Sequence, residues 1–182
     1  MRAAPIRRLV SFGIGEAWYA VDVAHVERVL RYEGVVPVPN MPPWMAGILE
    51  YQGRVVPVLA LRRRLGLSAE GVGAGGRLLL LALGDDVVAA AVDRVVDVRP
   101  VTDGEIAPPP PLVRGAAGAF LCGVLRRDDT MVFVLDAARL LSAESGMRLD
   151  AGADAPPTVS AVLGATLAAA AAVPACGAKA DD

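Results

Sequence analysis

Short apolar runs, separated by glycine, proline and charged residues, fill the chain up to about residue 150. One pair of runs covers residues 9–14 and 18–23, and a second pair covers residues 78–83 and 87–92. A glycine followed by an acidic residue lies between the two runs of each pair. Two short apolar runs joined by such a turn predict a β-hairpin. We therefore predict one hairpin in each half of this region.

A second hairpin signal follows in each half. It is carried by "AGILEYQGRVVPVLAL" at residues 46–61 and by "FLCGVLRRDDTMVFVLDA" at residues 120–137. The turns would lie at Gln52-Gly53 and Asp128-Asp129, residue types that reverse a strand. A short amphipathic helix is predicted after each hairpin, in "LRRRLGL" and "DAARLLSAE". Each half is thus predicted to hold two hairpins and one short helix.

The two halves also repeat each other in sequence. A shift of 69 positions sets Leu9 against Leu78 and aligns the valines at 23, 26 and 29 with those at 92, 95 and 98. A shift of 76 positions sets Gly47 against Gly123 and Val58 against Val134. Because both shifts keep the elements in the same order, the sequence predicts two similar lobes. The valines spaced three apart fit either a helix or a bent strand.

Composition favours strands as the main element. Hydrophobic residues make up 54% of the 182 residues but aromatic residues only 4%, so valine, leucine and alanine must build the core. We predict a mainly β protein of two small barrels, with prolines confined to connections or strand edges. "GVGAGG" at residues 71–76 lacks the lysine and the helix pattern of a phosphate-binding loop, and it is predicted to link the lobes.

Charge and residue chemistry exclude several function classes. A net charge of −2 gives no electrostatic reason to bind nucleic acid or an anionic membrane. The single histidine, His25, and two separated cysteines leave a metal site without ligands. No nucleophile stands at a recognisable elbow, so no catalytic residue, cofactor or enzyme activity is predicted. Acid–base chemistry at Asp93 or Asp136 is the weaker alternative.

The two ends of the chain bear on its location. The N-terminal apolar run is too short and interrupted for a secretory signal, so we expect a cytoplasmic protein. Residues 147–182 are alanine-rich, and residues 157–178 carry no charge. A membrane span needs about 20 apolar residues, but Gly164, Thr166 and Pro174 weaken this segment. We expect a flexible or partly helical tail without membrane insertion.

Taken in order, these segments resemble the CheW-like domain of bacterial chemotaxis coupling proteins, over residues 8–146. The likeness lies in "LVSFGIGEAWYAVDVAHVERVL", "VPVPNMPPWMAGILEYQGRVVPVLALRRRLGL", "LGDDVVAAAVDRVVDV", "EIAPPP" and "GVLRRDDTMVFVLDAARLL". It implies two five-stranded, SH3-like barrels, with lobe one at about 8–70, lobe two at about 77–146 and strand exchange possible between them. It further implies a non-catalytic adaptor that joins methyl-accepting chemoreceptors to a CheA-type histidine kinase in membrane-associated arrays.

The resemblance also implies where partners bind. A groove between the lobes would take the cytoplasmic tip of a receptor hairpin, as a helix docks in a groove. The candidate contacts are Val26, Arg28, Gly47, Ile48, Gln52, Arg62 and Val98. Several of these positions have a purely structural alternative. The valines would be core, Gly47 and Gly123 would exclude a Cβ, and Arg62 to Arg64 would be a solvated helical face.

Departures from the family pattern fall on this contact set. The usual Asn-Leu-Arg-Gly turn is Glu50 to Gly53 here, so Gln52 replaces an arginine, and a neutral amide cannot copy a guanidinium fork. Arg28 stands where an acid is frequent, and Ala60 stands where an aspartate is usual. Two alternative functions follow: a kinase-binding spacer or competitor without receptor binding, or a coupler in a motility or developmental system.

Overall fold

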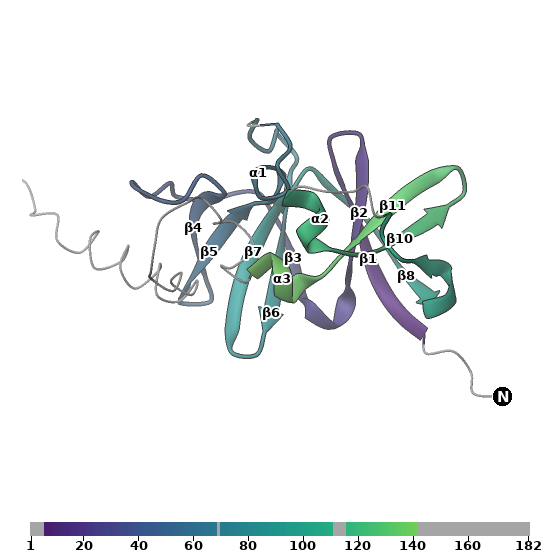
Figure 1. Ribbon diagram of the computed structural model, residues 1–182. Helices are drawn as coiled ribbons and strands as arrows, with labels where there is room; N and C mark the ends of the chain where they lie inside the picture. Colours follow the sequence, from purple (N-terminus) through teal and green to yellow (C-terminus); the bar gives the residue numbers. More distant parts are fainter. Residues whose placement is uncertain (1–5, 69, 111–115, 142–182) are drawn as a thin grey trace, which may run out of the picture.

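The computed structural model describes residues 6–68, 70–110 and 116–141 of the chain, and strands dominate these ranges (Figure 1). The strands are β1 (Ile6–Ile14), β2 (Ala17–Asp22), β3 (Val26–Arg31), β4 (Met45–Tyr51), β5 (Arg54–Ala60), β6 (Arg77–Leu83), β7 (Asp86–Val92), β8 (Arg94–Thr102), β9 (Ile106–Ala107), β10 (Leu121–Arg127) and β11 (Thr130–Leu135). The helices are α1 (Leu61–Arg64), α2 (Ala116–Phe120) and α3 (Ala137–Leu141), with 3-10 turns η1 (Val23–His25) and η2 (Asp103–Glu105). The predicted mainly β class with a few short helices is confirmed.

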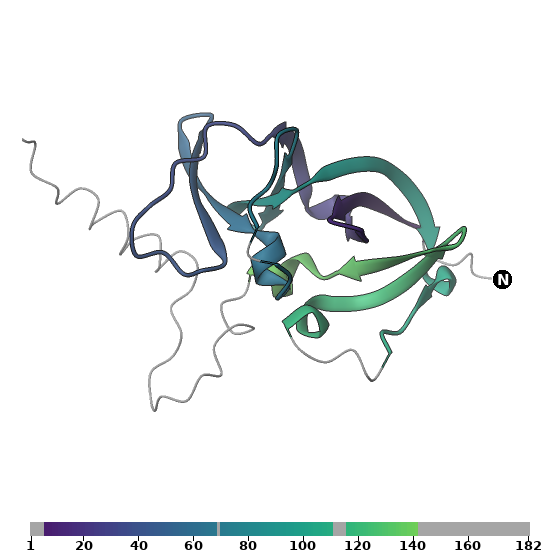
Figure 2. The same cartoon turned by 90° about the horizontal axis from the view of Figure 1, so that it is seen from above.

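The strands form two sheets that draw on both halves of the chain. The six-stranded sheet has the order β8-β1-β2-β11-β10-β9, and the five-stranded sheet has the order β3-β6-β7-β5-β4. Strand β2 therefore lies beside β11, as the purple and green strands of Figure 1 show. Figure 2 shows the two sheets next to one another from above. Residues 8–70 and residues 77–146 each contribute strands to both sheets.

Each half of the chain thus exchanges a hairpin with the other half. This exchange corrects the prediction that residues 71–76 link the two lobes. They connect α1 to β6, and β6 pairs with β3 and β7 of the five-stranded sheet that also contains β5. The segment therefore joins elements at one sheet instead of linking two lobes. The chain passes between the sheets elsewhere, at η1 before β3 and at Asp93 before β8. The valine pattern at 23, 26 and 29 is a 3-10 turn followed by a strand.

Strand pairing confirms the internal repeat. Val58 is paired in parallel with Ala89 of β7, and Val134 is paired in the same way with Ala20 of β2, as the shifts of 76 and 69 require. The β-bulges recur as well. One lies between Val26 and Arg28 on β3, and its equivalent on β8 falls where the pairing of β1 with β8 shifts between Ser11 and Phe12. The two sheets are therefore two copies of one arrangement.

Among the described residues, the buried apolar side chains form three clusters. The largest includes Val10 and Phe12 of β1 together with Leu79 and Leu81 of β6, so it joins the two sheets. Leu78 and Leu80 belong to a second cluster, within the five-stranded sheet. Leu9 belongs to a third cluster, within the six-stranded sheet. Because neighbouring residues of a strand face opposite sides, β1 and β6 are buried on both faces, which explains why consecutive residues in them are mostly apolar.

Pro57 lies in an interior strand, so the prediction that prolines stay in connections or at strand edges is wrong. It belongs to β5, which has β4 on one side and β7 on the other. Pro57 is paired with Ile48 of β4, whereas the parallel pairing with β7 begins one residue later, at Val58. The missing N–H therefore falls before that ladder starts, and the sheet tolerates the proline there.

Gly47 and Gly123 occupy equivalent bulges where a side chain has no room. Gly47 has φ 152°, and a Cβ added there would overlap the carbonyl oxygen of Val36. A Cβ at Gly123 would overlap the side chain of Ile106 and approach the carbonyl oxygen of Ala107 at 3.0 Å. These close approaches allow a further segment to pair with each hairpin. Val36 pairs with Ile48 of β4, and β9 pairs with β10. The proposed exclusion of a Cβ is seen at both positions.

Gly47→Ala is expected to lower the free energy of unfolding by about 1–3 kcal/mol, the usual cost of overpacking a tight site. Urea unfolding followed by circular dichroism measures the change. Gly104→Ala is the matched control, because a Cβ there meets nothing within 4 Å, and it should change stability by less than about 0.5 kcal/mol. Equal stability of the two variants would contradict the close approach of Val36.

Candidate functional site

The seven predicted contact residues lie on five parts of the fold. Val26 and Arg28 are on β3, and Gly47 and Ile48 are on β4. Gln52 is in the turn between β4 and β5, Arg62 is in α1, and Val98 is on β8. Strands β3 and β4 stand at opposite ends of the five-stranded order, whereas β8 is the first strand of the other sheet. The fold spreads these residues over several strands.

The β3 and β8 candidates differ in exposure. Val26 is half-buried against the core between the sheets, which supports its structural alternative. Arg28 is exposed, and so is Val98, with 43% of its surface accessible. Val29, the repeat equivalent of Val98, is exposed to a similar degree, at 40%. Both sheets therefore present an accessible valine on an edge strand.

The β4–β5 hairpin holds Gln52 at an exposed tip. Gln52 has φ 51°, and Asp128 has the same φ at the equivalent tip of the β10–β11 hairpin. Ile48 is half-buried, and its backbone exchanges two hydrogen bonds with Val36, at 2.8 and 2.9 Å. Of the hairpin candidates, Gln52 is thus the one with a side chain fully available to a partner, and it offers a neutral amide there.

Arg62 is held inside the protein. Its Nη2 donates to Asp93 Oδ2 at 2.5 Å, and the same carboxylate oxygen accepts from the backbone N–H of Gly15 at 2.6 Å. Only 16% of the Arg62 side chain is exposed. Arg62 follows a strand of the five-stranded sheet, and Gly15 is in the β1–β2 turn of the six-stranded sheet. The ion pair of Arg62 with Asp93 therefore joins the two sheets.

Arg64 points into a second inner contact. Its guanidinium lies 4.6 Å from the ring centre of Trp44 and 4.9 Å from that of Phe120, at distances typical of cation–π stacking. Its Nε donates to the carbonyl oxygen of Leu140 at 3.4 Å. Burial lowers the pKa of Arg64 from its ordinary value. Arg64 thus connects α1 to α2 and α3, and the solvated-face interpretation is wrong for Arg62 and Arg64, though Arg63 is exposed.

The acidic residues named as acid–base candidates have structural partners. Asp93 is engaged by Arg62 and Gly15, and Asp136 accepts from the backbone N–H of Arg139 and pairs with its side chain. Across residues 6–68, 70–110 and 116–141, no cluster of His, Cys, Asp and Glu is arranged to hold a metal ion. Within the same ranges, no helix is long and apolar enough to cross a membrane. The predicted tail, residues 147–182, lies outside the described residues.

Sequence reasoning overlooked the contacts that hold the sheets together. Asp93 ends an apolar strand beside a glycine-rich hairpin, and nothing local identifies Arg62 as its partner 31 positions away. Trp44 and Phe120 are also far in sequence from Arg64, whose guanidinium stacks on both rings. One signal was available: the repeat sets Ser11 against Leu80, so a polar residue occupies a predicted core position.

Asp93→Asn is expected to lower the free energy of unfolding by about 1.5–3 kcal/mol, because a charge-assisted hydrogen-bond acceptor is lost from a mostly buried pair. Asp136→Asn makes the same change at a more exposed pair, where about 1 kcal/mol or less is expected. Chemical unfolding of both variants provides the comparison. A loss at Asp93 no larger than that at Asp136 would remove the ion pair as the contact that joins the sheets.

Comparison with known proteins supports one family. The sequence model of the CheW-like domain matches residues 8–145. The chemotaxis protein CheW of Treponema pallidum is 26% identical over 146 residues, which cover 78% of this chain and 86% of that protein. Protein FrzA of Myxococcus xanthus is 31% identical over 125 residues, which cover 69% of this chain and 78% of that protein.

A solved structure has the same fold. The crystal structure of the scaffolding protein TtCheW from Thermoanaerobacter tengcongensis superposes with a TM-score of 0.70 at 26% identity. The match covers 80% of this chain and 99% of that one. With the family match spanning most of the described strands, the chain belongs to the CheW-like domain family.

Proposed function

We propose that this protein is a non-catalytic adaptor that couples chemoreceptors to a CheA-type histidine kinase. The observation that carries the proposal is the match to the CheW-like domain over residues 8–145. Its relatives include proteins named chemotaxis protein CheW and a protein named as a scaffolding protein. We further propose that the adaptor is cytoplasmic and that receptors bring it to the membrane.

The edge strands are the surfaces that we propose for docking. Strand β3 borders the five-stranded sheet and exposes Arg28 and Val29, and β8 borders the six-stranded sheet and exposes Val96 and Val98. An edge strand offers unpaired backbone groups beside its side chains, which suits association with another protein. Two equivalent edges on one molecule allow two partners to be held at once, which is what coupling requires.

Arg28 and Gln52 are the residues that we propose to set the choice of receptor. Both are exposed, so neither is needed by the core. Arg28 adds positive charge where the family pattern has an acid, and Gln52 removes it where the pattern has an arginine. Electrostatic complementarity decides which partners are excluded as well as which are accepted. We propose that the cognate receptor tip carries charges complementary to this reversed arrangement.

A pull-down against CheA-type kinases and receptor cytoplasmic tips of the host tests the proposal. The native chain is expected to retain both partners together, and Gln52→Arg is expected to weaken receptor binding while kinase binding is unchanged. Ala74→Arg adds the same charge at an exposed position of the α1–β6 connection, so it controls for charge alone.

Retention of the kinase alone, with receptor binding gained by Gln52→Arg, would replace coupling with a spacer or competitor function. Retention of neither partner would refute the adaptor proposal.

A further inference from the structure

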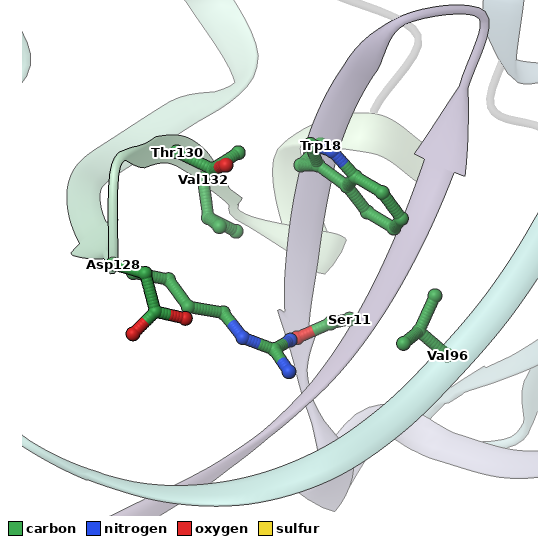
Figure 3. Close-up of a pocket in the computed structure, with 7 residues that line it drawn as sticks. Ser11, Trp18, Val96, Asp128, Thr130 and Val132 are labelled. Carbon is green, nitrogen blue, oxygen red and sulfur yellow. The ribbon is translucent and has the colours of Figure 1, made fainter.

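A hollow of about 180 Å³ opens within the six-stranded sheet (Figure 3). Figure 3 shows Trp18 from β2, Val96 from β8 and Val132 from β11 arranged around it, together with Ser11 of β1. Arg127, Asp128 and Thr130, at the β10–β11 turn, complete the lining. A smaller hollow of about 140 Å³ shares Ser11, Arg127 and Asp128. The two hollows therefore have part of their lining in common.

The internal repeat provides a comparison for this hollow. Ser11 is 6% exposed and pairs with Asp97, whereas its equivalent Leu80 is 0% exposed and pairs with Arg28. Leu80 packs inside the five-stranded sheet. In the six-stranded sheet, a small hydroxyl-bearing side chain replaces that leucine. No hydrogen bond satisfies the Ser11 hydroxyl within the described part of the chain. Ser11 Oγ is not among the fully buried polar atoms that lack a partner in the described residues, so solvent reaches it in the hollow, and a ligand hydroxyl can take the place of that solvent.

Contacts around the hollow hold its walls in place. The guanidinium of Arg94 lies 4.5 Å from the ring centre of Trp18. Arg127 donates two hydrogen bonds to the carboxylate of Asp97, at 3.2 and 2.9 Å. The equivalents of Asp97 and Arg127 in the other sheet are Arg28 and Tyr51, which cannot form such a pair. These contacts fix the walls of the hollow before any ligand binds, as in many ligand sites, and this ion pair has no counterpart at the equivalent positions of the other sheet.

Its size and lining select the chemistry of an occupant. A cavity of about 150 Å³ is enough to bind benzene, so this hollow has room for one six-membered ring. Indole and valine surfaces favour an apolar ring, and the Ser11 hydroxyl favours a ring that carries one hydrogen-bonding group. The charges of Arg127 and Asp97 neutralise each other, and the carboxylate of Asp128 in the lining disfavours an anion, so a neutral ligand fits best. We propose that the hollow binds a phenol-type ring, with the phenol hydroxyl hydrogen-bonded to Ser11 Oγ.

Titration of the isotope-labelled full chain with p-cresol, followed by amide chemical shifts, tests this site. Toluene serves as the comparison, because it has the same ring without the hydroxyl. We expect p-cresol to shift residues around Ser11, Trp18 and Val132 and to bind more tightly than toluene. Ser11→Ala should weaken p-cresol about three- to tenfold, the loss of one hydrogen bond, and leave toluene unchanged.

Variants separate the hollow from the rest of the surface. Ser11→Leu introduces the residue that the repeat has at this position, and it should fill the hollow and abolish binding of both probes. Ser68→Leu makes the same substitution at an exposed serine outside the hollow, and it should bind p-cresol as the native chain does. If Ser11→Leu does not fold, the Ser11→Ala comparison decides alone.

The phenol ring could come from a tyrosine side chain or from a free small molecule. A titration with a capped Ala-Tyr-Ala tripeptide distinguishes the two sources. The same shifts with the tripeptide would support a tyrosine side chain of a partner protein as the ligand, and shifts with p-cresol alone would support a free small phenol. Equal affinity of the native chain for p-cresol and toluene would overturn the proposal, as would shifts that lie away from Ser11 and Trp18. This site does not depend on the proposed coupling function.

Discussion

The carboxylate of Asp93 is the point at which the two sheets are fixed to one another. Asp93 lies where the chain leaves β7 of one sheet for β8 of the other. Its backbone N–H donates to the carbonyl oxygen of Gly13 at 3.1 Å, and its side chain accepts from Gly15 and from Arg62. A single chain connection would allow one sheet to rotate relative to the other. The backbone and side-chain hydrogen bonds of Asp93 together oppose that rotation. The shared apolar cluster between the sheets can then pack in one arrangement.

This fixed arrangement matters for an adaptor. Strand β3 begins just after one crossing between the sheets, and β8 begins just after the other. The exposed valines of both strands are therefore held in a constant relation through Asp93, Arg62 and the core. An adaptor transmits the position of one partner to another only if its own two surfaces do not move independently. The ion pair of Arg62 with Asp93 supplies that rigidity, because its charged groups connect the two sheets.

The features predicted correctly from sequence are those that depend on neighbours along the chain. The hairpins, the helices after them and the bulge glycine Gly47 all have local signals in period, turn residues and backbone freedom. The repeat added long-range information, because its two shifts are the registers of the parallel strand pairs. The errors at residues 71–76 and Pro57 came from not knowing which strands are neighbours, a property that local pattern does not contain.

The candidate site was less predictable than the fold, for a related reason. In sequence, Arg62 and Arg64 have the pattern of surface charges in a short basic helix. Arg62 is drawn inside by its contact with the distant Asp93. Arg64 is drawn inside by the rings of Trp44 and Phe120. Ser11 alone indicates only an interruption of an apolar run. Comparison with the buried Leu80 of the other sheet shows that Ser11 occupies a core position. Gln52 and Arg28 were placed on the surface by the fold, but what they contact depends on molecules outside this chain.

Exchange of the hairpins also determines when each sheet can finish folding during translation. The five-stranded sheet uses strands that end at Val92, so all of its residues are available early in translation. The β1–β2 hairpin, although made first, waits for β11 to pair with β2, which brings Trp18 beside Val132. Pairing across so long a stretch of chain is slow to form. The first strands to leave the ribosome are thus among the last to reach their final partners.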